Sequence, residues 1–194
     1  IDACLVGSEM CIRDRDWVIK LFIFSNPIGF LSTENYYKEM VNVYYEYYHA
    51  LQESAFIDEE LGDTYQFGDD TRRGPHWFYS GASTFMADYA VRKRESNNNL
   101  SPIKDWLKQQ FLFGESLIEQ GGCSEITLKE ISPENCFNLK FYWGEPAVAY
   151  LLSTISNPNA LNEVFYPNLY QLGFKDAFEL TFNKTLEEFY TEWD

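Results

Sequence analysis

The chain has 194 residues, of which 45% are hydrophobic and 18% aromatic, so it can form one well-packed domain and is too apolar for general disorder. Its formal net charge of −15 at pH 7 argues against nucleic acid or an anionic membrane surface as partner, because both require concentrated Lys and Arg. No hydrophobic run is long enough to predict a transmembrane span.

Residues 1–15 are considered apart from the fold. The stretch Cys4–Arg15 reads CLVGSEMCIRDR and resembles the translation of a sequencing-adaptor read-through, which is excluded from fold reasoning as an artefact. We therefore expect residues 16–194 to form a single domain. Because such a segment can replace a natural N-terminus, the sequence leaves the compartment open, and a secreted or periplasmic location is compatible with it.

The first half of the domain predicts a small β element followed by a long helix. Trp17–Phe24 is rich in β-branched and aromatic residues and ends in a Ser-Asn-Pro-Ile-Gly turn, which is typical of a strand. Thr64–Phe67 is a second possible short strand. Between them, residues 36–57 predict an amphipathic helix. Its apolar stripe repeats at steps of three and four and comprises Tyr37, Met40, Val41, Tyr44, Tyr48, Leu51 and Ala55.

The second half predicts helices throughout. Gly74-Pro75 and Ser101-Pro102 each begin a helix, since proline is favoured in a first helical turn, and Gly81 allows a neighbouring helix to approach closely. Further helices are predicted at residues 141–152, at residues 159–170 with an interruption at Pro167, and from the Thr185-Leu-Glu-Glu188 capping box to Trp193. The buried stripe of the helix after Pro75 comprises Phe78, Ala82, Phe85, Met86 and Tyr89.

Two cysteines, Cys123 and Cys136, lie within the predicted domain. Their spacing permits a disulfide without requiring one. We expect a pair of ordinary buried thiols.

Three separated stretches carry a family resemblance. Tyr45-Glu-Tyr-Tyr-His49 is similar to His-Glu-Tyr-Phe-His, and Gly74–Ala87 is similar to a Pro-x-Trp-Phe-x-Glu-Gly-x-Ala-x-Tyr helix. Ala177–Tyr190 is similar to a closing helical segment in which glycine commonly stands at the position of Asn183. Together they resemble the gluzincin-type zinc metallopeptidases of the peptidase MA-like group. The resemblance implies a zincin-like fold, α+β and predominantly α-helical, with a small N-terminal β element and a helical C-terminal lobe.

The resemblance also implies a site, from which this chain departs. A catalytic zinc needs three protein ligands, an open position for water and a glutamate that takes the water's proton. His49 keeps a ligand position and Glu46 keeps the base position, but Tyr45 and Ser80 stand where the other two ligands belong. Tyr142 falls where related sequences place a tyrosine that stabilises an oxyanion. With one imidazole and two hydroxyls we expect no bound cofactor.

Three functions follow from this pattern. The first is a catalytically inactive metallopeptidase-like domain that binds a peptide or protein in a residual cleft. The second is an active zinc hydrolase with a rearranged site of His49, His76 and Glu46, because His76 lies one turn before Ser80. The third is a structural or interaction module whose cleft is filled by Tyr45 and other aromatics. Each residue also has a structural interpretation: His49 as a hydrogen-bonded core histidine, Glu46 as a solvated carboxylate and Tyr142 as a packing residue.

Overall fold

The computed structural model describes residues 5–6, 9–10, 33–54, 68, 72–97, 99, 101–120, 123 and 126–193. Within these ranges the chain is predominantly α-helical, as the sequence predicts. The elements in chain order are β1 (Leu5–Val6), β2 (Glu9–Met10), α2 (Thr33–Ser54), α3 (His76–Glu95), α4 (Ser101–Glu119), the 3₁₀ helix η1 (Leu128–Glu130), α5 (Leu139–Tyr142), α6 (Gly144–Thr154), the π-helix η2 (Leu161–Phe165), α7 (Tyr166–Phe182) and α8 (Leu186–Trp193).

The two strands form a short antiparallel pair in which Leu5 lies opposite Met10. This pair belongs to the first fifteen residues, which the sequence analysis set aside. The strands predicted at Trp17–Phe24 and Thr64–Phe67 lie outside the described residues. The predicted long helix is α2, which begins at Thr33, three residues before the predicted start.

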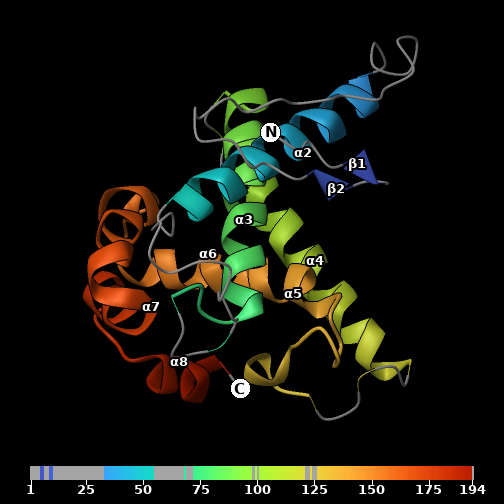
Figure 1. Ribbon diagram of the computed structural model, residues 1–194. Coiled ribbons are helices and arrows are strands. Elements are labelled where there is room, and N and C mark those ends of the chain that lie inside the picture. Colours follow the sequence, from blue (N-terminus) through green and yellow to red (C-terminus); the bar gives the residue numbers. More distant parts are fainter. Residues whose placement is uncertain are drawn as a thin grey trace.

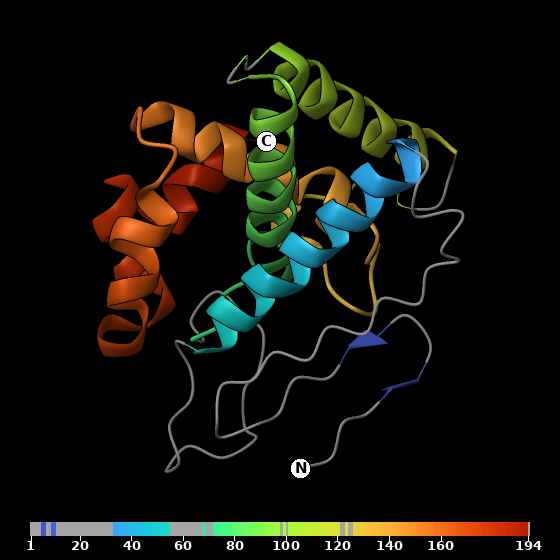
Figure 2. The same cartoon turned by 90° about the horizontal axis from the view of Figure 1, so that it is seen from above.

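Helix α3 runs through the middle of the helical body, with α4 on one side and α7 and α8 on the other (Figures 1 and 2). It packs against α2, α4, α5 and α6. The close approach expected at Gly81 is made to Gly144, since a Cβ on Gly81 would lie 2.3 Å from the Gly144 carbonyl oxygen. The predicted stripe of α3 is buried at Phe78, Ala82, Phe85 and Met86 and partly buried at Tyr89.

The core beside α3 is largely aromatic. Phe78 is almost fully buried and its ring lies 5.0 Å from Phe165 and 5.1 Å from Phe174 between ring centroids. Trp77 packs on the other side against Phe189 and donates its indole N–H to the Tyr190 hydroxyl at 3.0 Å. These ring contacts hold α3 against η2, α7 and α8. They thereby fix the position of the α3 face that packs against α2.

The last third of the chain departs from two predicted helix boundaries. The helix predicted for residues 141–152 is divided at Trp143 into α5 and α6. The interruption predicted at Pro167 is wrong, because Pro167 lies in the first turn of α7, where its missing N–H costs little. The non-helical residue is Gly173, with φ of 77° and ψ of 174°, a backbone conformation that glycine adopts readily.

One local signal near the C-terminus is confirmed. The Glu188 carboxylate accepts the backbone N–H of Thr185 at 2.7 Å, and the Thr185 hydroxyl accepts the Glu188 N–H at 3.2 Å. This reciprocal pair is the predicted capping box. Asn183, which ends α7, has a left-handed backbone with φ of 53°, and glycine and asparagine are the residues that favour this conformation.

The expectation of two free thiols is wrong. Cys123 and Cys136 form a disulfide with their Cα atoms 5.7 Å apart, a separation typical of this bond. Spacing alone could not indicate the pairing, which depends on how the segment after α4 folds back before α5. None of the helices within the described ranges is both long and apolar enough to cross a bilayer.

Candidate functional site

Tyr45, His49 and Ser80, which the sequence analysis placed at predicted ligand positions, meet where α2 packs against α3. The Tyr45 ring stands edge-on to the His49 ring, with centroids 4.3 Å apart. The Ser83 and Ser80 side chains lower the pKa of the Tyr45 hydroxyl, against the larger effect of burial, so the three hydroxyls lie close together. His49 reaches the same point, because its Nε2 lies 3.2 Å from the Ser83 Oγ. Tyr45, His49 and Ser80 therefore line one small region, with Ser83 at its centre.

Ser83 is a site residue that the sequence analysis did not single out. It is fully buried, and its Oγ lies 3.1 Å from the Tyr79 carbonyl oxygen and 3.0 Å from that of Ser80. It stands three residues after Ser80, and positions three apart share a helix face. That spacing was the available signal, but serine on a helix usually bonds its own backbone, as it does here.

His49 is held as a neutral imidazole. Its ring lies between Tyr45 and Tyr79, the second at 4.7 Å between centroids and tilted by 32°. Burial lowers the pKa of His49 to about 4, partly opposed by the Gln52 side chain and reinforced by the positive charge of Lys140. Gln52 faces the ring closely enough to favour its protonated form, although His49 Nδ1 has no hydrogen-bond partner of good geometry.

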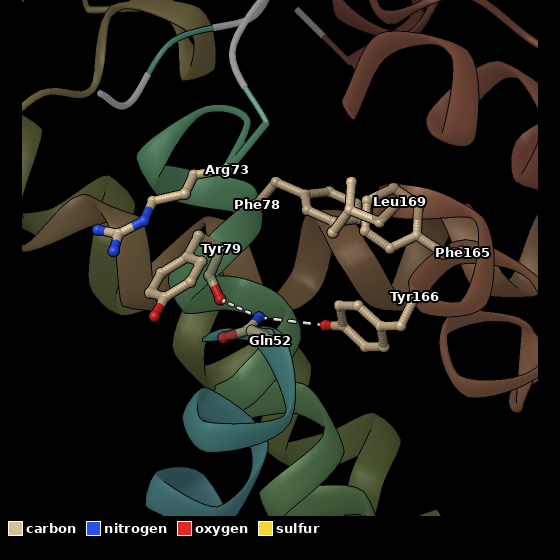
Figure 3. Close-up of a pocket in the computed structure, with 7 residues that line it drawn as sticks. All are labelled: Gln52, Arg73, Phe78, Tyr79, Phe165, Tyr166 and Leu169. Atoms are coloured by element: carbon tan, nitrogen blue, oxygen red, sulfur yellow. Dashed lines mark hydrogen bonds between the residues drawn. The ribbon is translucent and has the colours of Figure 1, made fainter. Parts of the chain in front are cut away.

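Gln52 joins the site to the rest of the core. It is only 2% exposed, and its Nε2 donates to the Tyr79 carbonyl at 2.8 Å and to the Tyr166 hydroxyl at 3.1 Å. Figure 3 shows the carboxamide between these two tyrosines. The small pocket beside it is walled by the apolar rings and side chains of Phe78, Tyr79, Phe165, Tyr166 and Leu169, with Arg73 at its edge. Its accessible space of about 10 Å³ admits at most one water molecule.

The pKa values of Tyr45 and Glu46 are also shifted. Burial raises the pKa of Tyr45 above its ordinary range, and the adjacent Glu46 raises it further, so the phenol stays protonated. Burial also raises the pKa of Glu46 above its ordinary value. A neutral phenol is a poor metal ligand, and the base position carries a carboxyl whose charged form is disfavoured.

His76 and Tyr142 lie against other partners. The His76 ring packs on Phe137 at 5.7 Å, and the Tyr142 ring packs on Phe113 at 4.7 Å. These two contacts place His76 beside Phe137 and Tyr142 in an aromatic pair with α4.

Positive charge surrounds the two imidazoles. The Lys140 ammonium lies 3.4 Å from the centroid of the Phe137 ring and 4.7 Å from that of Phe141. Burial lowers the pKa of Lys140 to about 8. Lys140 and Arg73 both lower the pKa of His49 and of His76, so each cation acts on both rings.

The residues present do not fit a catalytic zinc. Such a metal requires imidazole, carboxylate or thiolate ligands, whereas Tyr45 and Ser80 offer neutral hydroxyls and Lys140 adds positive charge nearby. Across the part of the chain that the structure describes, no group of three His, Cys, Asp or Glu is arranged to hold a metal ion. No catalytic step through a metal is derived from this arrangement.

Comparisons of the chain with protein-family models, with curated proteins and with solved structures give no match. The residue pattern and the geometry around Tyr45 are therefore the grounds on which a function is proposed.

Proposed function

We propose that this chain is a catalytically inactive, zincin-like metallopeptidase domain whose former metal position is filled by its own side chains. The observation that carries the proposal is the gathering of Tyr45, Ser80 and Ser83 beside His49, whose ring lies 4.3 Å from that of Tyr45 between centroids and whose Nε2 lies 3.2 Å from the Ser83 Oγ. The residues at the three lost or retained ligand positions meet, and they meet as neutral groups. In this proposal the domain works as an interaction module for a peptide or protein, and it hydrolyses nothing.

Features away from the site support the ancestry. Gly81 follows the former ligand position Ser80 and makes a backbone-to-backbone contact with Gly144, which explains why the similar helix pattern carries glycine there. Asn183 has the left-handed backbone that suits the glycine common at this position in the related pattern. Two independent backbone requirements thus agree with the resemblance.

The contacts favour a filled site over an open peptide groove. Ser80 and Ser83 are buried, His49 is covered by the rings of Tyr45 and Tyr79, and the adjoining pocket has room for about one water. A partner would therefore bind to an outer surface of the domain. Specific retention of members of a random hexapeptide pool by the wild-type chain, lost in a Ser80→Phe variant, would favour the groove instead.

An active hydrolase built on His49, His76 and Glu46 finds less support. His49 is engaged with Ser83 and Tyr79, and His76 packs on Phe137. Glu46 alone cannot lower the pKa of a water molecule, which in this chemistry depends on the metal. The alternative predicts zinc retention and metal-dependent cleavage, and both are measurable.

The experiment that tests the proposal restores the ligands. The wild-type chain should retain no stoichiometric zinc after purification and should not cleave a fluorogenic peptide pool. The Tyr45→His, Ser80→Glu double variant should retain about one zinc per chain, because it adds one imidazole and one carboxylate to the His49 imidazole and so completes three ligands. Stoichiometric zinc in the wild-type chain would contradict the loss of the site.

The matched control adds His49→Ala to the double variant. If the restored zinc is held at this site, the triple variant should lose it while keeping the same helical circular dichroism. A double variant that folds and takes up no zinc would remove the argument for metallopeptidase ancestry. Zinc that survives His49→Ala would show binding elsewhere in the chain.

A further inference from the structure

A second polar cluster lies about two turns beyond Ser80 on α3, where four helices meet. Its members are Tyr37 of α2, Asp88 and Arg92 of α3, Trp106 of α4 and Glu145 of α6. Asp88 is 4% exposed and Glu145 is 1% exposed. Two buried carboxyl groups in one cluster are unusual, because each charge removed from water needs a compensating partner.

Asp88 has the stronger set of partners. Its Oδ1 accepts the Tyr37 hydroxyl at 2.7 Å and the Arg92 Nε–H at 3.1 Å. The Arg92 guanidinium also lies over two rings, 4.9 Å from the centroid of Tyr37 and 4.2 Å from that of Trp106. The cation is thus fixed beside Asp88 by packing as well as by the ion pair.

Among the hydrogen bonds of the described residues, the donor to Glu145 is neutral. The Trp106 indole N–H is shared between its two oxygens, at 3.1 Å and 3.3 Å. Of the described side chains, Asp88, Trp106 and Arg92 are those that shift the pKa of Glu145. The cluster therefore contains two carboxyl groups and one guanidinium, so full ionisation would leave one buried negative charge uncompensated.

We propose that Asp88 and Glu145 hold one proton between them in the folded chain near neutral pH, carried mainly by Glu145, and that this proton latches α6 to α3 and α4. The ion pair with Arg92 favours the charge on Asp88. A protonated Glu145 keeps its contact with Trp106 and removes the repulsion between the two carboxyl groups. We call these five residues the acid latch.

The acidities agree with this assignment. Burial raises the pKa of Glu145 well above its ordinary value, and the charge of Asp88 raises it further. Burial raises the pKa of Asp88 above its ordinary value, and Tyr37, Arg92 and Trp106 offset part of that rise. The described titratable and charged groups that face the latch are Tyr37 from α2, Asp88 and Arg92 from α3, and Glu145 from α6; α4 contributes the neutral Trp106.

The sign of the pH effect follows from linkage. A carboxyl group whose pKa is raised by folding binds a proton more tightly in the folded chain than in the unfolded chain. Its contribution to stability is therefore fully present below the unfolded pKa of about 4.5 and is lost as pH rises toward the folded pKa. The acid latch therefore contributes most to the stability of the fold in acid and least at alkaline pH.

The test compares the wild-type chain with a Glu145→Gln variant in urea unfolding from pH 4 to pH 8. Gln has the shape of a protonated Glu, so the two chains should have similar folding constants at pH 4. Above pH 4.5 the folding constant of the variant relative to wild type should rise by up to about tenfold per pH unit, the slope for one proton. A ratio that is flat or falls with pH would overturn the proposal.

Two further measurements keep the test decisive. Glu179→Gln removes the same charge from an exposed position of α7 and should leave the ratio flat. Asp88→Asn removes the carboxylate that pairs with Arg92, so the guanidinium can stabilise a charge on Glu145 instead. In that background the effect of Glu145→Gln on the folding constant should depend less steeply on pH. If Glu145→Gln does not fold, the carboxyl ¹³C titration of Glu145 in the wild-type chain replaces it: ionisation below pH 6 would overturn the proposal, and ionisation above pH 7 would support it.

Discussion

Two buried polar clusters lie along α3, and they solve the same problem in different ways. Around Ser83, hydroxyls and one imidazole lie together without a net charge. In the acid latch, one guanidinium faces two carboxyl groups. The first cluster consists of neutral groups, and the second depends on a proton. Burial alone does not decide which arrangement a helix interface adopts.

The clusters consequently respond to acid in opposite directions. His49 has a pKa of about 4 in the folded chain, so acid charges it at the expense of the fold. Glu145 has a raised pKa, so acid neutralises it to the benefit of the fold. Substitutions that separate these two responses test the comparison directly.

The largest effect is expected for Arg92→Met. The substitution removes the only described cation of the acid latch, while methionine keeps much of the packing against Tyr37 and Trp106. Removing one partner of a buried ion pair costs about 3–5 kcal/mol. We expect a loss of that order in urea unfolding at pH 7, and a smaller loss at pH 4, where the latch carries less charge.

The control for this substitution is Arg94→Met, which removes the same charge from an exposed position of α3. It should change the unfolding free energy by less than about 0.5 kcal/mol. A loss at pH 7 no larger than that of Arg94→Met would contradict the pairing of Arg92 with a charged Asp88.

A somewhat smaller effect is expected from the titration of His49. A histidine whose pKa is lowered on folding contributes stability that is fully present above pH 6.5 and is lost as pH falls toward 4. The shift corresponds to about 3 kcal/mol across that window. The loss should be reduced in a His49→Gln variant. With only two histidines in the chain, ring titration by NMR can measure both values separately.

The second histidine, His76, provides the control for that titration. His76 has a lowered pKa as well, through burial and the charges of Lys140 and Arg73, and His76→Gln serves as the matched control. A His49 ring that titrates near pH 6.5 would mean that the ring is open to water, and the filled site would then be untenable.

Local signals in the sequence determined much of the fold. The capping box at Thr185, the helix start at Ser101 and the close contact at Gly81 each depend on residues within a turn or on one backbone requirement, and each was predicted. The convergence of Tyr45 with Ser80 followed from assigning two motifs to two packed helices.

The remainder depends on contacts between distant segments. Tyr37 and Asp88 are 51 positions apart, and Trp106 and Glu145 are 39 positions apart. No local pattern pairs such residues, so the acid latch was not predicted. The contacts of Gln52 were not predicted for the same reason, because its partners Tyr79 and Tyr166 belong to other helices.

The smallest effect is the most direct comparison, because one substitution can be made in both clusters on the same helix. Tyr45→Phe removes a hydroxyl that lies beside two serine hydroxyls, and the loss of a neutral hydrogen bond costs about 1 kcal/mol. Tyr37→Phe removes a hydroxyl that donates to Asp88 at 2.7 Å, and a hydrogen bond to a charged group is worth about 2 kcal/mol. Urea unfolding at pH 7 should therefore rank Tyr37→Phe as the costlier change, and only its cost should decline toward pH 4. Equal and pH-independent costs would mean that Asp88 is uncharged, in which case the two clusters would not differ as described.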